Sequence, residues 1–325
     1  MSYTNFPNGV TSMGIPAHAG LPMIRGQWYF VEPVTGSDGN SGKELKKPFL
    51  TFAKAYDACT SSAGDGICVL NKDTGTTSTN TLYVAAELDW IKCGITVFGV
   101  CAPTMFGQRS RLANTTTVLT IPQIIHMSTA AHNNSFYNLQ VANWGTNLAA
   151  VGAFKCEGNR NYFQNCHFVA AGAPAYVLSD FELAGSNNTF VNCMFGTDTT
   201  QKSATEYANV LISGDGANNA ADNMFNDCIF LCYHNATSAS CIVSAGATSV
   251  MGGHYFRRCM FIGCKGGATP ALAIDDIATL TATNAYYYCL GCAIYNISAW
   301  GGHSKVYIEN AATAASAGGG IATTV

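Results

Sequence analysis

Three aspartates have the spacing that comes closest to an acid–base or cation site. Asp180, Asp215 and Asp276 each lie 13 residues before a cysteine of a recurring motif, so a repeating fold would line them up. Neighbouring carboxylates can share a proton or bind a cation, and glycoside hydrolysis uses a carboxylate pair. No lysine or arginine accompanies them on the same segments. We therefore favour turn capping at strand ends over catalysis for these three candidates.

A recurring cysteine is the second feature that could do chemistry, as a nucleophile or a metal ligand. The motif reads "YFQNCHF" at 162–168, "TFVNCMF" at 189–195, "MFNDCIF" at 224–230 and "YFRRCMF" at 255–261. The one CxxC, Cys289–Cys292, lacks a second CxxC or a pair of histidines at ligand spacing. We therefore expect no metal and no cofactor. The cysteines should act as small apolar core residues, and His167 should point outward, away from Cys166.

The motif also reveals an internal repeat. Its first phenylalanine recurs at 136, 163, 190, 225 and 256, and Tyr286 takes the sixth place. An apolar segment ends 13 residues before each aligned cysteine, as "AYVLSD" (175–180) and "VLISGD" (210–215) show. A variable period around a constant motif indicates one structural coil per repeat. The fixed distance predicts that insertions fall between the Cys-x-Phe strand and the next apolar segment.

Such coils must stack, because each is too short to bury its own apolar side chains. Parallel stacking pairs the backbone groups and places equivalent side chains above one another. Asparagine tolerates the left-handed conformation and suits a tight bend between two strands. In the last three coils other residues replace it, and we expect bends there that are wider or differently capped. The predicted ladder residues are Phe163, Asn165, Cys166, Phe190, Asn192, Cys193, Phe225, Cys228, Phe256 and Cys259.

The two ends of the chain differ from the repeats. Residues 1–27 are interrupted by glycine and proline but rich in apolar side chains, which predicts an extended arm. After a strand at 29–31, the residues Phe49, Phe52, Ala53, Tyr56 and Cys59 indicate one apolar face of a short helix. We expect the repeats to occupy 28–310 and a Gly/Ala-rich tail to follow at 311–325.

Composition excludes several classes of protein. Charged residues make up 11% of the chain and the net charge is −3, with no basic run, which argues against a nucleic-acid partner. No segment reaches about 18 uninterrupted apolar residues, so no membrane span is expected. The first residues lack a charged region followed by an apolar one, so we expect no secretory signal. The expected site of synthesis is therefore a cytoplasm.

The helical segment at 49–59, the strand "GDGICVL" and the F-x-N-C-x-F coils resemble right-handed parallel β-helix proteins of the pectate-lyase-like class. The fold class implied is all-β, a single-stranded right-handed solenoid with a short N-terminal helical cap. The opening "NFPNGVTSMGIPAHAGLP" further resembles phage virion proteins that carry such a β-helix behind an N-terminal arm. That resemblance implies a structural protein of a phage particle, commonly a homotrimer.

Two functions from different classes follow, and a third is less favoured. The first is a non-enzymatic capsid decoration or cement protein, a homotrimer located in the virion that binds the major capsid protein or another virion protein. Its arm would supply the contacts, through Phe6, Val10, Met13, Ile15, Leu21 and Met23. The alternative is a tailspike-like glycan-binding or polysaccharide-depolymerising protein, with Tyr286–Tyr288, Tyr295 and Trp300 able to stack on sugars. A cellular pectate-lyase-like enzyme is the third hypothesis.

Overall fold

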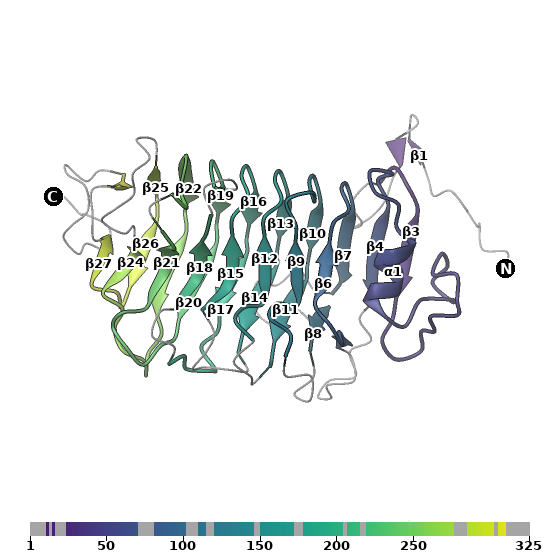
Figure 1. The fold of residues 1–325 in the computed structure, drawn as a ribbon, viewed down its shortest axis with the longest axis horizontal. Helices are drawn as coiled ribbons and strands as arrows, with labels where there is room; N and C mark the ends of the chain where they lie inside the picture. Colours follow the sequence, from purple (N-terminus) through teal and green to yellow (C-terminus); the bar gives the residue numbers. More distant parts are fainter. Residues whose placement is uncertain are drawn as a thin grey trace.

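The computed structural model describes residues 24–70, 81–101, 110–114, 120–145, 150–171, 178–203, 207–214, 219–246, 248–275, 285–301 and 305–309. It also describes the backbone of two short strands, β1 (Thr11–Ser12) and β2 (Ile15–Pro16), which form an antiparallel pair. The remaining strands described belong to three parallel sheets that run the length of the solenoid (Figure 1).

We number the sheets in the order in which one coil visits them. Sheet I contains β3 (Trp28–Val31), β4 (Gly66–Leu70), β7 (Thr96–Val100), β10 (Ser135–Tyr137), β13 (Tyr162–Gln164), β16 (Thr189–Val191), β19 (Met224–Asn226), β22 (Gly253–Arg257), β25 (Tyr286–Leu290) and β28 (Val306–Ile308). Sheet II contains β5 (Leu82–Tyr83), β8 (Arg111–Ala113), β11 (Gln140–Asn143), β14 (His167–Ala170), β17 (Met194–Gly196), β20 (Ile229–Cys232), β23 (Met260–Gly263) and β26 (Ala293–Tyr295). Sheet III contains β6 (Leu88–Trp90), β9 (Ile125–Met127), β12 (Phe154–Cys156), β15 (Ser179–Leu183), β18 (Ala208–Ile212), β21 (Ser240–Ser244), β24 (Leu272–Asp275) and β27 (Ala299–Gly301).

This arrangement is the predicted right-handed parallel β-helix. From β4 onward each coil passes from one sheet to the next, and every strand inside a sheet pairs with its counterparts in the coils before and after it. Equivalent positions are therefore in register: Phe163 lies opposite Phe136 on one side and opposite Phe190 on the other. Because the backbone groups pair between coils, the side chains of each column share one environment.

Stacked phenylalanines fill the interior. The ring centroids of Phe163 and Phe190 are 4.8 Å apart, those of Phe190 and Phe225 4.6 Å, and those of Phe225 and Phe256 4.7 Å, with nearly parallel planes. The ring of Phe181 in sheet III meets Phe190 edge-on at 5.2 Å. Parallel contacts along a column and edge-to-face contacts between columns are both favourable aromatic geometries, so the sheets hold one another together through this core.

The bends between sheets I and II have one conformation along the solenoid. The residue at each of these bends has a positive φ, and it precedes Leu139 in the first coil of the set and a column cysteine in the others. We call this set the bend column: Asn138 (55°), Asn165 (52°), Asn192 (51°), Asp227 (55°) and Arg258 (50°). Of the two alternatives predicted for the later coils, the bends at Asp227 and Arg258 are differently capped rather than wider. In the earlier coils the side-chain amide of Asn165 donates a hydrogen bond to Oδ1 of Asn138 at 3.1 Å. At Asp227 and Arg258 a pair of 2.7 Å hydrogen bonds from the guanidinium of Arg258 to the carboxylate of Asp227 takes its place.

A second asparagine column lies inside the solenoid, and the motif did not reveal it. This buried column consists of Asn134, Asn161, Asn188 and Asn223, each at most 1% exposed. Oδ1 of Asn161 accepts hydrogen bonds from the backbone N–H (2.9 Å) and the side-chain amide (3.1 Å) of Asn134. Asn188 accepts the equivalent pair from Asn161 at 2.9 and 3.1 Å. The column satisfies backbone groups that would otherwise be buried without partners.

The last motif is shifted by three residues from the predicted alignment. Phe256 pairs with Cys289, not with Tyr286. Gly291 then takes the bend with φ 62°, and Cys292 follows it. The prediction failed because either Cys289 or Cys292 could be aligned with the motif cysteine. Only the strand register shows that Cys292 is the equivalent residue.

The predicted place of the insertions is also wrong. Phe181 pairs with Val210 in sheet III, and Phe190 pairs with Phe225 in sheet I. The connection from sheet III to sheet I therefore lengthens, because it runs from 181 to 190 in one coil and from 210 to 225 in the next. The apolar segments had been aligned by their last residues, whereas β18 ends at Ile212 and the rest of "VLISGD" follows it. The alignment therefore counted loop residues as strand.

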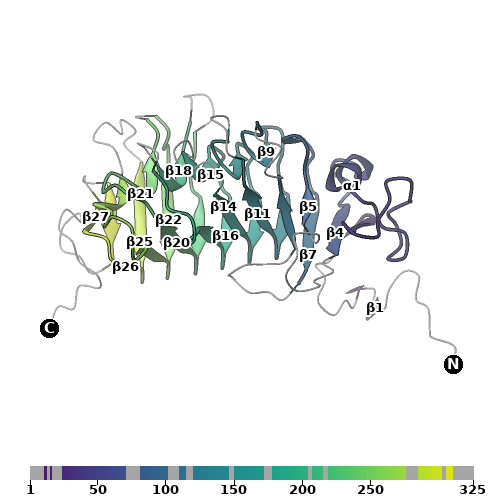
Figure 2. The same cartoon turned by 90° about the horizontal axis from the view of Figure 1, so that it is seen from below.

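A short helix covers the N-terminal end of the solenoid, as expected for a cap (Figure 2). Helix α1 (Phe52–Ala58) begins after Thr51, whose side chain accepts a hydrogen bond from the backbone N–H of Lys54. Phe52 and Tyr56 are buried, and the ring of Tyr56 is 4.6 Å from that of Trp90. Ala53, predicted on the apolar face, is exposed. No helix among the described residues is long and apolar enough to cross a membrane.

Candidate functional site

Of the three aspartate candidates, only Asp180 lies within the described residues. The register of β15 with β18 places Asp180 opposite Asn209, so the predicted alignment of Asp180 with Asp215 is wrong. Asp180 is completely buried, and its oxygens accept hydrogen bonds from the backbone N–H of Ala170, the hydroxyl of Tyr207 and the amide of Asn209. Asp215 and Asp276 lie outside the described residues. Asp180 therefore links the end of β14 to the start of β18.

Lys202 is the cation that accompanies Asp180. It is 1% exposed, and its Nζ lies 5.9 Å from the ring centroid of Tyr207. Burial lowers the pKa of Lys202 to about 8, although the charge of Asp180 partly opposes this shift. Burial likewise raises the pKa of Asp180 above its ordinary value. This buried pair has no solvent-exposed member at which a substrate could react.

The motif cysteines also lie in the core. Cys166, Cys193 and Cys228 are buried, and each sulfur is within 3.6 Å of the carbonyl oxygen of a phenylalanine in the preceding coil. All fourteen cysteines are free thiols. Burial raises the pKa of the Cys166 thiol well above its ordinary value, so it stays protonated at neutral pH.

His167 alternates along β14 with the core residue Phe168, as an outward-pointing side chain would, but it is covered. It is buried and does not point into solvent: its Nδ1 accepts a hydrogen bond from the amide of Gln140 at 2.7 Å, and its Nε2 donates to the carbonyl of Gly196 at 2.8 Å. Burial lowers the pKa of His167 to about 4, so the ring is neutral at pH 7. The sequence could not show that other segments cover this face of sheet II.

A row of charged residues crosses sheet III, in a chain that has few charges. The register places Asp89, His126, Lys155 and Glu182 opposite one another on consecutive strands. Glu87 and Glu157 flank this row, and we call the six residues the charged strip. The side chains of its ion-paired members are 20–29% exposed. At this burial their ion pairs are less screened than on an open surface.

The contacts within the charged strip are specific. Nζ of Lys155 lies 3.0 Å from Oε1 of Glu157 and 3.4 Å from Oε1 of Glu182. Burial opposes the ionisation of Glu157, yet Lys155 and His126 hold the pKa of this carboxyl below its ordinary value. Glu157 is therefore a carboxylate over the whole neutral range.

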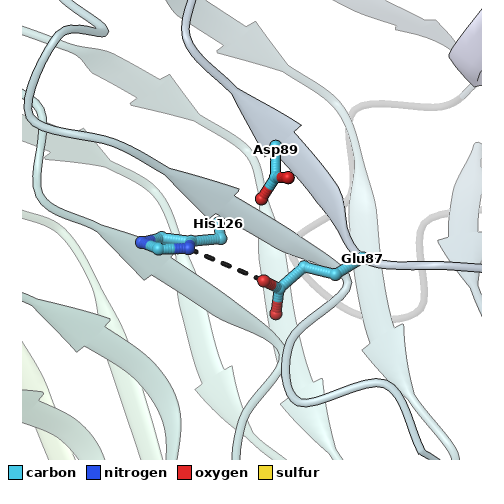
Figure 3. Close-up of side chains that lie close together, drawn as sticks. All are labelled: Glu87, Asp89 and His126. Carbon is cyan, nitrogen blue, oxygen red and sulfur yellow. Dashed lines mark ion pairs between the residues drawn. The ribbon is translucent and has the colours of Figure 1, made fainter.

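One end of the charged strip gathers three potential metal ligands. Nδ1 of His126 lies 3.6 Å from Oε1 of Glu87, and Nε2 of the same ring lies 3.3 Å from Oε2 of Glu157. Asp89 and Glu87 are both directed toward the ring of His126 (Figure 3). One ligand atom from each of Glu87, Asp89 and His126 lies within 4.8 Å of the other two. Within the described ranges, no other group of three such residues is this close.

Four tyrosines, one exposed and three partly exposed, form a second surface near the C-terminal end of sheet I. The ring of Tyr288 stacks on Tyr255 at 5.1 Å and on Tyr307 at 5.7 Å, and Tyr286 meets Tyr307 edge-on at 5.3 Å. We call these four residues the tyrosine platform. A side chain at Gly253 would meet Tyr255 and Tyr288 at 3.0 Å, so this glycine leaves space for their rings.

The predicted aromatic group is therefore divided between surface and core. Tyr287 and Trp300 are buried, whereas Tyr295 is 68% exposed. Of the proposed arm contacts, only Ile15 has a described backbone, in β2. The other five, Phe6, Val10, Met13, Leu21 and Met23, lie outside the described residues.

Sequence reasoning missed the charged strip and the buried asparagine column. The column has a readable signal, because an asparagine stands two residues before the motif phenylalanine in "NSF", "NYF", "NTF" and "NMF". The charged strip has no repeated signal. Its members are of different types, and only the register of sheet III brings them together.

Comparison with solved structures supports the fold. A pectin methylesterase from Aspergillus niger superimposes with a TM-score of 0.50 at 14% identity, covering 90% of this chain and 94% of the other. A pectin methylesterase mutant in complex with a hexasaccharide gives a TM-score of 0.50 at 15% identity, covering 86% of this chain and 80% of the other. No family model and no curated protein sequence matches the chain. At this identity the likeness establishes the architecture that the sequence had predicted.

Proposed function

We propose that this chain is a glycan-binding parallel β-helix protein, the tailspike-like alternative predicted from its sequence. The observation that carries the proposal is the tyrosine platform, in which Tyr255, Tyr288 and Tyr307 stack in one row on consecutive strands of sheet I. Tyr307 is 44% exposed, and Tyr255, Tyr286 and Tyr288 are partly exposed. Exposed aromatic side chains grouped in this way commonly mark binding sites.

A tyrosine row matches the chemistry of a sugar chain. Because these rings stack on one another, the row presents ring edges and hydroxyls, which can contact the C–H and hydroxyl groups of a sugar chain. The strand spacing of about 4.8 Å repeats these groups at intervals suited to successive sugars. Lys305, whose Nζ lies 4.8 Å from the ring centroid of Tyr286, adds positive charge beside the row. We therefore propose an extended polysaccharide that carries some acidic groups.

The proposal is binding rather than cleavage. Asp180 was the one described member of the candidate catalytic set, and its carboxylate is buried with both oxygens hydrogen-bonded. A general acid must reach the bond that it protonates. The fold is compatible with a bound glycan, since the pectin methylesterase mutant with a similar fold was solved in complex with a hexasaccharide.

The test is to measure binding of acidic and neutral oligosaccharides by calorimetry to the wild type, Tyr288→Ala and Tyr307→Ala. Tyr83→Ala is the matched control, because Tyr83 is also exposed but lies in sheet II. Loss of a stacking ring should weaken binding roughly tenfold, corresponding to about 1.4 kcal/mol. If no oligosaccharide binds, or if the platform variants bind as tightly as the control, the proposal is wrong.

The virion role is the second proposal, and the strand pair within the predicted arm favours it. Among the described strands, β1 and β2 pair with each other and join none of the three solenoid sheets. Such a segment is available to contact another subunit or a major capsid protein, in a homotrimeric decoration or cement protein carried on the virion. Comparing the molecular mass of the full chain with that of residues 28–325 would test this, because a full chain that remains monomeric contradicts the trimer.

A further inference from the structure

We propose that Glu87, Asp89 and His126 form a binding site for a divalent transition-metal ion, of the Zn²⁺ or Mn²⁺ class. The site lies where β6 and β9 run side by side in sheet III (Figure 3). This proposal departs from the sequence-based expectation of no metal, which considered the cysteines, the histidine spacing and three other aspartates. The tyrosine platform is on sheet I, so the metal site is independent of the proposed glycan site.

The separations suit a metal ion of this size. Zinc binds histidine nitrogen and carboxylate oxygen at about 2.0–2.2 Å, so neighbouring ligand atoms in a tetrahedral site lie about 3.3–3.6 Å apart. Nδ1 of His126 and Oε1 of Glu87 are 3.6 Å apart. Asp89 completes a group whose ligand atoms lie within 4.8 Å of one another. Small side-chain rotations would bring all three to bonding distance, without any movement of the strands.

The orientation of the His126 ring is the second, independent observation. Its Nε2 is shielded from solvent and lies 3.3 Å from Oε2 of Glu157. Metal-bound histidines usually direct their second ring N–H at a carboxylate, which fixes the tautomer. With Nε2 beside Glu157, Nδ1 of the same ring faces the carboxylate of Glu87, 3.6 Å away, and that of Asp89. A cation between these groups would offset the repulsion between the two carboxylates.

The supporting residues fix this geometry. Lys155 holds Glu157 in place through its 3.0 Å ion pair. The second carboxylate oxygen of Glu87 accepts a hydrogen bond from the backbone N–H of Gln123 at 3.1 Å, which leaves Oε1 free to face the ring. These contacts hold the ligands on the rigid strands of the solenoid.

The ligand types select the class of metal. One imidazole and two carboxylates favour Zn²⁺ or Mn²⁺ over Ca²⁺ and Mg²⁺, which prefer ligand sets made only of oxygen. Three protein ligands leave at least one coordination position for water or another ligand.

The test is calorimetric titration of Zn²⁺ and Mn²⁺ into untagged, chelator-treated full-length protein. The wild type should bind one ion, and Asp89→Asn and His126→Asn should bind at least about 100-fold more weakly. Glu157→Gln removes only the carboxylate behind the ring and should cost about 10–100-fold. Glu182→Gln is the matched control from the same strip and should bind as the wild type does.

A second readout separates binding from misfolding. Zn²⁺ should raise the thermal midpoint of the wild type and of Glu182→Gln, but not that of Asp89→Asn. Asp89 is exposed, so its amide variant should fold normally. If the wild type binds neither ion, or if folded Asp89→Asn binds as tightly as the wild type, the strip is an ion-pair network and the proposal is overturned.

Discussion

Two asparagine columns run along the same solenoid, one in its interior and one at its bends. The buried column repeats asparagine at 134, 161, 188 and 223 before His254 replaces it in the next coil. The bend column begins with three asparagines and continues with Asp227, Arg258 and Gly291. The buried column therefore keeps one residue type over four coils, whereas the bend column changes its chemistry after three.

The difference reflects what each column must supply. A buried asparagine accepts two hydrogen bonds from the preceding coil and donates to the following one, so its amide is needed in full. A bend residue needs only to adopt a positive φ near solvent. Asparagine does so readily and glycine without cost. Asp227 and Arg258 accept that conformation and form a partly exposed ion pair, with side chains 37% and 65% exposed. Polar groups are thus constrained most where water cannot replace a lost partner.

The largest expected effect comes from placing the same apolar residue in each column. Asn161→Leu should lower the free energy of unfolding by roughly 2–5 kcal/mol, because it leaves two buried amide donors of Asn134 without acceptors. Asn165→Leu should cost only about 1–2 kcal/mol, from left-handed strain. Urea denaturation measures both. Equal costs in the two columns would contradict the comparison.

The end of the buried column provides a pH test. His254 is completely buried, and burial lowers the pKa of its imidazole to about 3. Between about pH 6.5 and 3 the unfolded chain binds a proton that the folded chain does not, so stability falls as the pH is lowered. We expect a loss of roughly 2 kcal/mol between pH 7 and pH 5 from this residue.

The matched variant for the pH test is His254→Asn, which extends the column without a titratable group. The stability difference between wild type and variant should change by about 2 kcal/mol over the same pH interval. Buried His167, whose pKa is about 4, is present in both proteins, so its contribution cancels. If this difference did not change with pH, His254 would be ionising in the folded chain.

The smallest effects are expected at the bend. Asn165→Gly should change stability by less than about 0.5 kcal/mol, because glycine adopts a φ of 52° without strain. Asn165→Ala should cost about 1 kcal/mol more than glycine, since alanine has a Cβ in the left-handed region. Thermal melts of the two variants would show this order. A reversed order would mean that the amide bond to Asn138, rather than the backbone conformation, dominates the bend.

Much of the interior could be predicted from local pattern. The F-x-N-C-x-F motif identified the phenylalanine and cysteine columns and the left-handed bend at Asn165, because each coil repeats the same local requirements. The last coil could not be aligned, since Cys289 and Cys292 satisfy the motif equally well. The Asp180 prediction failed for a related reason: its position was counted along the chain, whereas its neighbours are set by the strand pairing that places Asn209 beside it.

The sequence by itself determined the repeating coil, because stacking identical side chains requires a periodic pattern that can be read without coordinates. Only the tertiary structure decided which outward-facing residues meet. Asp89, His126, Lys155 and Glu182 come from four coils and share no motif, yet parallel pairing places them on one row. Solvent-facing positions carry no repeated packing requirement, so their neighbours depend on long-range register, and both proposed sites lie on those faces.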